Sequence, residues 1–318
     1  MKKITGFLQL IRAGNLFIVA LSLCLFYYLI LVPTHHSKLL TGLLPFSSTE
    51  FVLFVISIVC VAAAGNIIND YFDFELDKEY KPERPLAQGL FSLDTAMYLH
   101  AGLAFVGIGI GFYLGYWANS IKIGYIYVIC QLMLYVYSAF LKKVPLAGNV
   151  LIAALTGFVF VVLMLFELQF LRLVHFDNAN YVLDVLLLQV KFYGGFAFLT
   201  NLAREIVKDI EDAEGDAAYN INTLPVQFGT GIAKAVVFIV LGVLLAALIF
   251  FLRNFWLAGA VREFGYLAVA VVLPLFVVLA LLVAAKQKKD YCRISLLLKA
   301  VMLMGILSIL AFYLFNKQ

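Results

Sequence analysis

Long hydrophobic runs of about twenty residues alternate along the chain with short polar connections. A helix that crosses a bilayer needs roughly 20 mainly apolar residues, whereas a transmembrane barrel strand shows about ten residues of alternating polarity. We therefore predict an all-α, polytopic membrane helix bundle with nine transmembrane helices, forming a single domain over residues 1–318. The predicted spans cover residues 14–32, 50–69, 95–118, 121–141, 146–167, 183–203, 232–252, 265–285 and 293–315.

The composition supports a membrane protein and excludes a soluble one. Hydrophobic residues make up 64% of the chain and charged residues 13%, and the mean hydropathy is +1.01. A soluble globular protein is about 45–50% apolar and about 25% charged. The connections are too short for a soluble domain. We expect the lipid bilayer to be a partner and nucleic acid not to be one.

The distribution of Lys and Arg predicts how the chain crosses the membrane. If the N-terminus is inside, fifteen Lys and Arg lie on that side, six lie on the other, and Lys191 and Lys299 fall within spans. Because Lys and Arg concentrate in cytoplasmic loops, this count predicts an N-inside, C-outside topology. The first apolar run is longer than the h-region of a signal peptide, so we interpret it as a retained span. We expect the protein to lie in the cytoplasmic membrane.

Twelve of the nineteen acidic residues lie in two short windows. The windows follow the second and the sixth predicted spans, so both should emerge on the cytoplasmic side. Two clusters far apart in sequence are then expected to face each other across one cavity. The windows contain Asp70, Asp73, Glu75, Asp77, Glu79 and Glu83, and then Glu205, Asp209, Glu211, Asp212, Glu214 and Asp216.

Helical periodicity predicts one acidic face in each window. If the second span continues as a helix through the first window, its amide and carboxylate side chains fall within about 100° of arc, while Glu75 and Glu79 point away. In the second window the stripe is narrower, and Glu211 and Glu214 lie off it. The two faces comprise Asn66, Asn69, Asp70, Asp73 and Asp77, and then Glu205, Asp209, Asp212 and Asp216.

Stacked carboxylates predict a cation between them. Like charges three or four residues apart destabilise a helix, and crowding at low dielectric raises their pKa values unless a cation compensates. Oxygen ligands favour Mg²⁺ or Ca²⁺, and Mg²⁺ usually takes one or two carboxylates, waters and substrate phosphates. We therefore expect Mg²⁺ sites that clamp a diphosphate; the alternative is two solvated acidic loops. The expected ligands are Asn69, Asp70, Asp73, Asp77, Asp209, Asp212 and Asp216.

The motifs in and around these windows resemble those of the UbiA superfamily of intramembrane prenyltransferases. The first window reads NxxxDxxxD from Asn69, followed by KPERPL, and the second reads REIVKDIEDAEGD from Arg204, followed by TLP. Arg12 and Asn15 are similar to the superfamily's R-x-x-N at the first span, and YSAFLKK, from Tyr137, to its YSxxLK. NDYFDFELD and REIVKDIED look most like the digeranylgeranylglyceryl phosphate synthase branch.

The resemblance implies Mg²⁺-dependent transfer of a geranylgeranyl-like group from an isoprenoid diphosphate to a lipophilic acceptor, such as geranylgeranylglyceryl phosphate. The enzyme would be a transferase of alkyl groups other than methyl. Mg²⁺ and fixed cations would stabilise the leaving diphosphate, and Tyr137 would turn its ring or hydroxyl toward the allylic cation. The implied catalytic residues are Asp73, Asp77, Asp209, Asp212 and Tyr137. The implied substrate-binding residues are Asn66, Asn69, Arg84, Lys142, Arg204, Lys208, Arg12 and Asn15.

Several alternatives remain open from the residues alone. The same mechanism would prenylate an aromatic quinone precursor, although this chain has Lys81-Pro82-Glu83 where the aromatic branch usually shows Arg-Thr. A transporter should carry its polar residues near the bilayer midplane, whereas here they gather at one interface. Gly107, Gly111 and Gly115 recur every four residues and predict close helix packing rather than a nucleotide site. Lys191 and Lys299 are either functional or snorkelling side chains.

Overall fold

The computed structural model describes residues 2–36, 46–174 and 179–317. Within these ranges the chain forms helices and no β-strand. Two π-helical turns, Tyr27–Leu31 and Ala268–Val272, and a 3₁₀ turn, Leu141–Lys143, interrupt or join the α-helices. These are α1 (Lys2–Leu10), α2 (Ala13–Phe26), α3 (Val32–His36), α4 (Ser48–Phe72), α5 (Phe74–Tyr80), α6 (Leu93–Trp117), α7 (Lys122–Ala139), α8 (Ala147–Val174), α9 (Ala179–Ala218), α10 (Leu224–Phe228), α11 (Thr230–Leu257), α12 (Val261–Leu267), α13 (Leu273–Ala284) and α14 (Lys288–Phe315).

The described part of the chain contains nine helical segments that are long and apolar enough to cross a membrane, which confirms the predicted all-α fold. The largest difference from prediction is at the sixth span, because that helix continues from residue 203 to Ala218 through the second acidic window. The segments are Ala13–Thr34, Ser48–Phe72, Leu93–Trp117, Lys122–Ala139, Ala147–Leu171, Leu183–Ala218, Thr230–Leu257, Val261–Ala284 and Lys288–Phe315.

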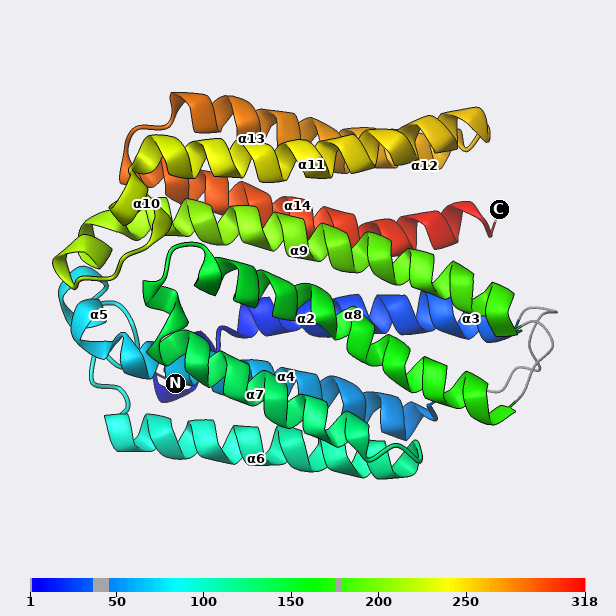
Figure 1. Cartoon of the computed structure of the whole chain (residues 1–318), viewed down its shortest axis with the longest axis horizontal. Coiled ribbons are helices and arrows are strands. Elements are labelled where there is room, and N and C mark those ends of the chain that lie inside the picture. Colours follow the sequence, from blue (N-terminus) through cyan, green and yellow to red (C-terminus); the bar gives the residue numbers. More distant parts are fainter. Residues whose placement is uncertain (1, 37–45, 175–178, 318) are drawn as a thin grey trace. The chain divides into compact units, whose positions relative to one another are not determined.

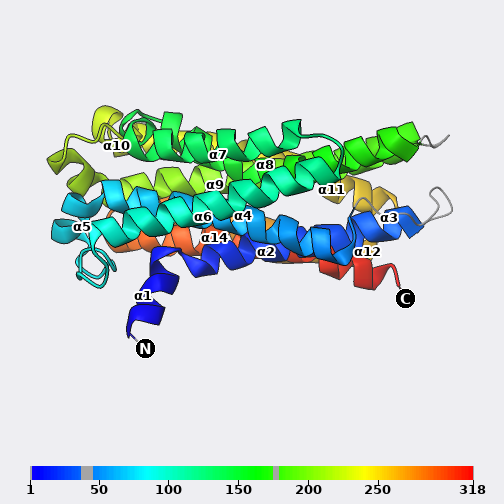
Figure 2. The ribbon, with the colours of Figure 1, turned by 90° about the horizontal axis from the view of Figure 1, so that it is seen from below.

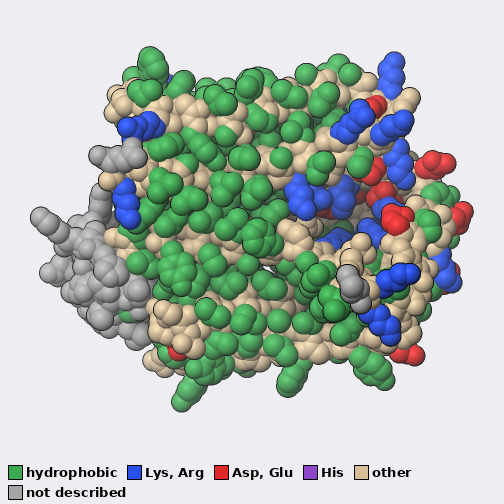
Figure 3. Space-filling view, turned by 180° about the vertical axis from the view of Figure 1, so that it is seen from behind, with side chains coloured by type: hydrophobic (Ala, Val, Ile, Leu, Met, Phe, Trp, Pro, Cys, Tyr) green, Lys and Arg blue, Asp and Glu red, His purple; other side chains and the backbone are tan. Residues whose placement is uncertain are grey.

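Large hydrophobic side chains cover much of the protein's exterior, as Figure 3 shows for one face. Phe105 on α6 is 79% exposed, and Val283 and Leu296, on α13 and α14, are each 70% exposed. A water-soluble monomer rarely leaves such an extended apolar surface uncovered. The chain is therefore an integral multi-pass membrane protein whose exposed helix faces contact lipid.

The chain divides into two compact units. Unit 1 comprises Met1–Cys24, Thr34–Leu141 and Val162–Asp184, and unit 2 comprises Leu25–Pro33, Lys142–Val161 and Val185–Gln318. The first acidic window belongs to unit 1 and the second to unit 2. That the whole chain acts as one domain, and that the two windows face each other, stay predictions.

In unit 1, α6 packs along α4 and α7 through a face of small residues (Figure 1). A Cβ added at Gly107 would lie 2.9 Å from Val61, and one at Gly111 would lie 2.5 Å from the ring of Tyr127. Gly115 is also buried against α7, whereas Gly109 faces open space. The predicted packing role of the glycines is confirmed.

In unit 2, α9, α11, α13 and α14 share one apolar core. Ala203, Val237, Leu275 and Leu298 lie in it with no exposed surface. α8 and α9 approach each other closely at Gly157, where a Cβ would come 2.6 Å from the carbonyl oxygen of Gly194. The core and this close approach fix the position of α9, which carries the second acidic window.

The first helix, α1, lies at an angle to α2 and extends away from it (Figure 2). Its buried side packs on the loop that precedes α6, because a Cβ at Gly6 would lie 2.9 Å from Leu90. Leu10 is buried with Ile67 and Leu86 in a small apolar cluster. This cluster joins three separate parts of the chain directly beside the first acidic window.

Candidate active site

The turn between α1 and α2 holds Arg12 in a left-handed backbone conformation, with a φ of 54°. Its carbonyl oxygen accepts a hydrogen bond from the backbone N–H of Asn15 over 2.8 Å. Asn66 on α4 donates a hydrogen bond from Nδ2 to the carbonyl oxygen of Ile11 over 2.9 Å. Because positive φ is unfavourable for a residue with a Cβ, these contacts are needed to hold the turn. They fix the start of α2 against α4.

The helix does not run unbroken through the first acidic window, so that prediction is wrong. α4 ends at Phe72, and Asp73 adopts φ −86° and ψ 0° before α5 begins. Helical hydrogen bonds persist on both sides, from the N–H of Asp73 to the Asn69 carbonyl over 3.0 Å and from the N–H of Asp77 to the Asp73 carbonyl over 2.8 Å. Asp is a poor residue for a helix interior because its carboxylate favours other conformations. The result is a bend at Asp73.

The two sides of this bent helix nevertheless differ in exposure as periodicity predicts. Asn69 and Asp77 are buried, with exposed fractions of 7% and 3%, and Asp73 is half-buried. Glu75 and Glu79 are exposed. The carboxylates that share a face thus turn into unit 1, and those off the face turn to solvent.

The carboxyl of Asp77 has a raised pKa because it is buried. Burial raises the pKa of the Asp77 carboxyl to about 6. Arg84 lowers that pKa, and the carboxylates of Asp73 and Asp70 raise it. The Asp77 carboxyl is therefore poised to gain or lose a proton under mildly acidic conditions.

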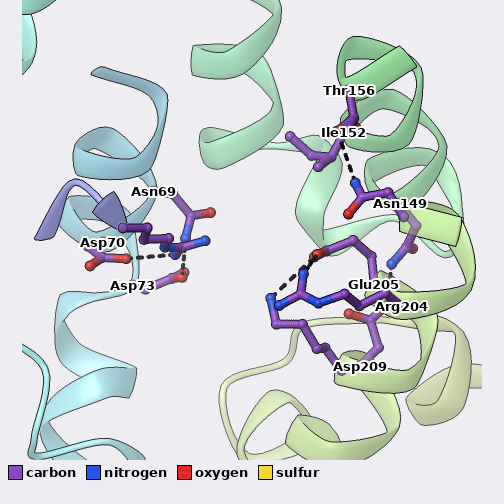
Figure 4. A network of polar contacts seen from close by, with 12 residues as sticks. Asn69, Asp70, Asp73, Asn149, Ile152, Thr156, Arg204, Glu205 and Asp209 are labelled. Atoms are coloured by element: carbon purple, nitrogen blue, oxygen red, sulfur yellow. Dashed lines mark hydrogen bonds and ion pairs between the residues drawn. The ribbon is translucent and has the colours of Figure 1, made fainter. Parts of the chain in front are cut away.

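Asp70 lies between two arginines that come from different parts of unit 1. Its Oδ1 accepts hydrogen bonds from Nη2 of Arg12 over 2.9 Å and from Nη1 of Arg84 over 2.7 Å. The Asp70 side chain is 2% exposed, whereas the side chains of Arg12 and Arg84 are 26% and 28% exposed. Figure 4 shows Asp70 with Asn69 and Asp73. The carboxylate is covered and the two guanidinium groups remain partly open.

The loop between α5 and α6 brings Arg84 to this place. The loop turns through a hydrogen bond from the Arg84 N–H to the Lys81 carbonyl over 3.0 Å, and another from the Gln88 N–H to the Arg84 carbonyl over 2.9 Å. Leu86 is buried in the apolar cluster beside α1. Gly89 follows with a φ of 70°, a conformation that suits glycine. The KPERPL segment is therefore an ordered loop anchored by its apolar residue.

In unit 2, the second acidic window lies on the continuous helix α9, as predicted. Asp209 is oriented by Asn149 at the start of α8, which donates a hydrogen bond from Nδ2 to the Asp209 Oδ2 over 2.8 Å (Figure 4). A second link joins the same helices, from the Asn201 Nδ2 to the Thr156 Oγ1 over 3.1 Å. Sequence reasoning missed Asn149, although its place near the start of the predicted span that follows the YSAFLKK segment was a usable signal.

Glu205 also contacts two cations, but it uses both of its carboxylate oxygens and both cations lie on its own helix. It accepts a hydrogen bond at Oε1 from Nη1 of Arg204 over 2.8 Å and one at Oε2 from Nζ of Lys208 over 3.3 Å. The three side chains are 16%, 14% and 30% exposed for Arg204, Glu205 and Lys208. Two of the predicted diphosphate-binding cations are thus gathered by one carboxylate.

The other carboxylates of the second window lie further along α9. Asp216 is buried and accepts a hydrogen bond from the Thr223 hydroxyl over 3.3 Å, which gives a structural role to the threonine of the TLP segment. Asp212 is half-buried, and so is Glu211, although periodicity placed Glu211 off the stripe. Glu214 is exposed, as predicted.

The remaining predicted residues lie near the ends of spans or within them. Tyr137 is half-buried near the end of α7 in unit 1, and Lys142 is half-buried in the following turn, which belongs to unit 2. Lys191 on α9 is exposed and Lys299 on α14 is half-buried. The structure adds no contact that gives either of these two lysines a function.

The donor set of the first window fits a hard divalent cation. Asn69 donates a hydrogen bond from Nδ2 to the Asp73 Oδ2 over 3.0 Å, and the Asn69 Oδ1 is buried without a hydrogen-bond partner. In the described part of the chain, no group of three Asp, Glu, His or Cys side chains is close enough to hold a metal ion by itself. Mg²⁺ does not require such a group, because it usually retains waters and binds substrate phosphates.

Comparison with known proteins assigns the fold and the chemistry. The UbiA prenyltransferase family matches residues 30–309. A digeranylgeranylglyceryl phosphate synthase from Methanosphaera stadtmanae is 31% identical over 264 residues, which cover 81% of this chain and 86% of the relative.

Two solved structures resemble the whole chain. One, of a digeranylgeranylglyceryl phosphate synthase in membranes, has a TM-score of 0.62 and 25% identity, covering 97% of this chain and 99% of the other. The second is a homologue from Archaeoglobus fulgidus bound to Cd²⁺, with a TM-score of 0.54 and 15% identity, covering 96% of this chain and 99% of the other. The second likeness concerns the fold alone.

Proposed function

Because the chain belongs to the UbiA prenyltransferase family, we propose that it transfers a geranylgeranyl-like group to geranylgeranylglyceryl phosphate. The chain is a prenyltransferase that uses an isoprenoid diphosphate donor, a lipophilic acceptor and a divalent metal. The product named for its relatives carries two geranylgeranyl groups on glyceryl phosphate, so the acceptor of the last transfer carries one. The observation that carries the proposal is an acidic window in each unit that combines carboxylates with paired cations.

The metal in this proposal is Mg²⁺. The residues that would hold it are Asn69, Asp73 and Asp77 in unit 1, and Asp209, Asp212 and Asp216 in unit 2. When bound, Mg²⁺ neutralises charge on the diphosphate as it leaves. The oxygen donors in each set suit a hard cation.

The chain's own cations bind the diphosphate directly. Arg12, Arg84, Arg204 and Lys208 lie partly exposed beside the acidic residues. As the allylic C–O bond breaks, its electron pair moves to the diphosphate oxygen, where these fixed charges stabilise it. The acceptor's hydroxyl oxygen then bonds to the allylic carbon, and its proton passes to the released diphosphate or to water. Tyr137 orients its ring toward the carbon that becomes positive.

We place this chemistry on the cytoplasmic side of the cytoplasmic membrane. Fifteen Lys and Arg on the side of both acidic windows, against six on the other, support that orientation. A diphosphate donor would then reach the site from the cytoplasm without moving its charge across the bilayer. Its apolar tail would enter the helix bundle laterally from lipid.

The test is an acceptor panel with purified protein. Labelled geranylgeranyl or farnesyl diphosphate is supplied with Mg²⁺ and, in separate reactions, with geranylgeranylglyceryl phosphate, an aromatic acid or a naphthoate. We expect label in the glyceryl phosphate product with the geranylgeranyl donor, and none with an Asp73→Ala variant. Preferred labelling of an aromatic acceptor would assign the chain to quinone precursor prenylation instead.

A further inference from the structure

In each acidic window one carboxylate contacts two cationic side chains. Asp70 contacts Arg12 and Arg84 over 2.9 and 2.7 Å. Glu205 contacts the cations at positions 204 and 208 over 2.8 and 3.3 Å. In both units, therefore, one carboxylate gathers two positively charged side chains.

The position of the charges suits an anion rather than a metal. Asp70 is 2% exposed beneath two guanidinium groups that are 26% and 28% exposed, so a ligand arriving from solvent meets the cations first. A divalent cation at Oδ1, the oxygen that both guanidinium groups contact, would lie beside two positive groups and be repelled by both. The other oxygen, Oδ2, is buried without a hydrogen-bond partner. Partly exposed guanidinium groups are good partners for phosphate oxygens.

The arginines of the first group need a fixed anchor because they come from distant parts of the chain. Arg12 lies in a strained turn held by Asn66, and Arg84 lies in a loop held by Leu86. Long cationic side chains lose considerable conformational entropy when they are ordered. An anchor that already orders both of them before a ligand arrives reduces the cost of binding that ligand.

We propose that Asp70 and Glu205 are positioning residues, each of which holds two cationic side chains as a preformed pair that binds the diphosphate of the donor, and that neither carboxylate is a metal ligand. This rests on the proposed function. It assigns Asp70 a different role from the metal-ligand role expected from the sequence. In this proposal the metal is held by Asn69, Asp73 and Asp77 in unit 1 and by the carboxylates further along α9.

The test separates anion binding from metal binding in purified protein without acceptor. Inorganic diphosphate binding is measured by isothermal titration calorimetry in Mg²⁺, and Mn²⁺ binding by electron paramagnetic resonance without diphosphate. The variants are Asp70→Asn and Glu205→Gln, which keep side-chain shape, with Asp73→Asn as the metal-site control. We expect Asp70→Asn and Glu205→Gln to weaken diphosphate binding by about tenfold to a hundredfold, with Mn²⁺ binding unchanged, and Asp73→Asn to weaken both.

A double-variant cycle tests whether Asp70 acts through the arginine. In an Arg12→Gln background, Asp70→Asn should weaken diphosphate binding much less than it does in the wild-type protein. Because buried Asp70 also supports the fold, thermal unfolding is followed in parallel, and Glu205→Gln provides a second, less buried site.

The possible outcomes are distinct. Loss of Mn²⁺ binding in Asp70→Asn equal to that in Asp73→Asn would make Asp70 a metal ligand and overturn the proposal. Lower thermal stability with unchanged diphosphate affinity would make the pairs purely structural and overturn it as well. A wild-type protein that binds neither Mn²⁺ nor diphosphate would instead refute the proposed function.

Discussion

Asn149 at the start of α8 donates a hydrogen bond to the Asp209 carboxylate of α9 over 2.8 Å. The amide fixes one carboxylate oxygen and leaves the other to point elsewhere. Because the bond joins two helices of unit 2, it orients Asp209 more firmly than the helix backbone alone.

This relationship predicts a loss of activity when Asn149 is changed. Asn149→Ala should lower kcat/KM by about tenfold, since a hydrogen bond to a charged group contributes about 1.5–3 kcal/mol and only part of that orients Asp209. Steady-state kinetics with saturating acceptor measures the effect. Asn254→Ala, at an exposed position on α11, is the matched control and should leave the kinetics unchanged. Equal activity in both variants would show that Asp209 needs no partner.

Exposure predicts which acidic residues of the windows matter. Asp73→Ala should remove nearly all turnover, while Glu75→Ala should retain most of it, because the Glu75 side chain is 73% exposed and points to solvent. Asp212→Ala and Glu214→Ala form the corresponding pair on α9. Glu214 is used because it is exposed, whereas Glu211, like Asp212, is half-buried. Similar losses in both members of a pair would contradict the assignment of the acidic faces.

Metal dependence should vary with pH because of Asp77. Activity should be abolished by EDTA and restored by Mg²⁺. The Asp77 pKa is raised to about 6 by burial, so below that pH the carboxyl is protonated and is a poor cation ligand. The Mg²⁺ concentration for half-maximal activity should therefore rise as the pH falls through about 6. Titrations from pH 5 to 8 measure this, and Asp77→Asn should remove the pH dependence. Full activity in chelator would refute a metal-dependent reaction.

The proposed orientation predicts which sites react from outside the cell. Single cysteines are placed at Glu79, Glu214 and Val261 in a background without the four native cysteines, and intact cells are treated with an impermeant maleimide. All three positions are exposed. Val261→Cys should react in intact cells, and the other two only after permeabilisation. Ser37 and Asn178, the outside positions that the sequence suggests, lie outside the described residues. Reaction of Glu79→Cys in intact cells would contradict the proposed topology.

The sequence predicted the spans well because burial in lipid requires uninterrupted apolar runs, which are visible without tertiary information. It did not predict the bend at Asp73, where a local conformational preference overrides helical periodicity. Nor did it predict the pairing of Asp70 with Arg12, since these residues are 58 positions apart and meet only through the packing of α1, α4 and the KPERPL loop. Asn149 escaped notice because an amide beside an apolar run carries no charge signal.

The helix α9 contains 40 residues, so at 1.5 Å per residue it is about 60 Å long, twice the roughly 30 Å thickness of a bilayer's hydrocarbon core. The apolar span and the second acidic window therefore share one continuous helical backbone. Asp209, Asp212 and Asp216 are carried by that backbone as one body, and the packing of unit 2 sets its position. In α4, by contrast, the bend at Asp73 separates the backbone of the span from that of Asp77.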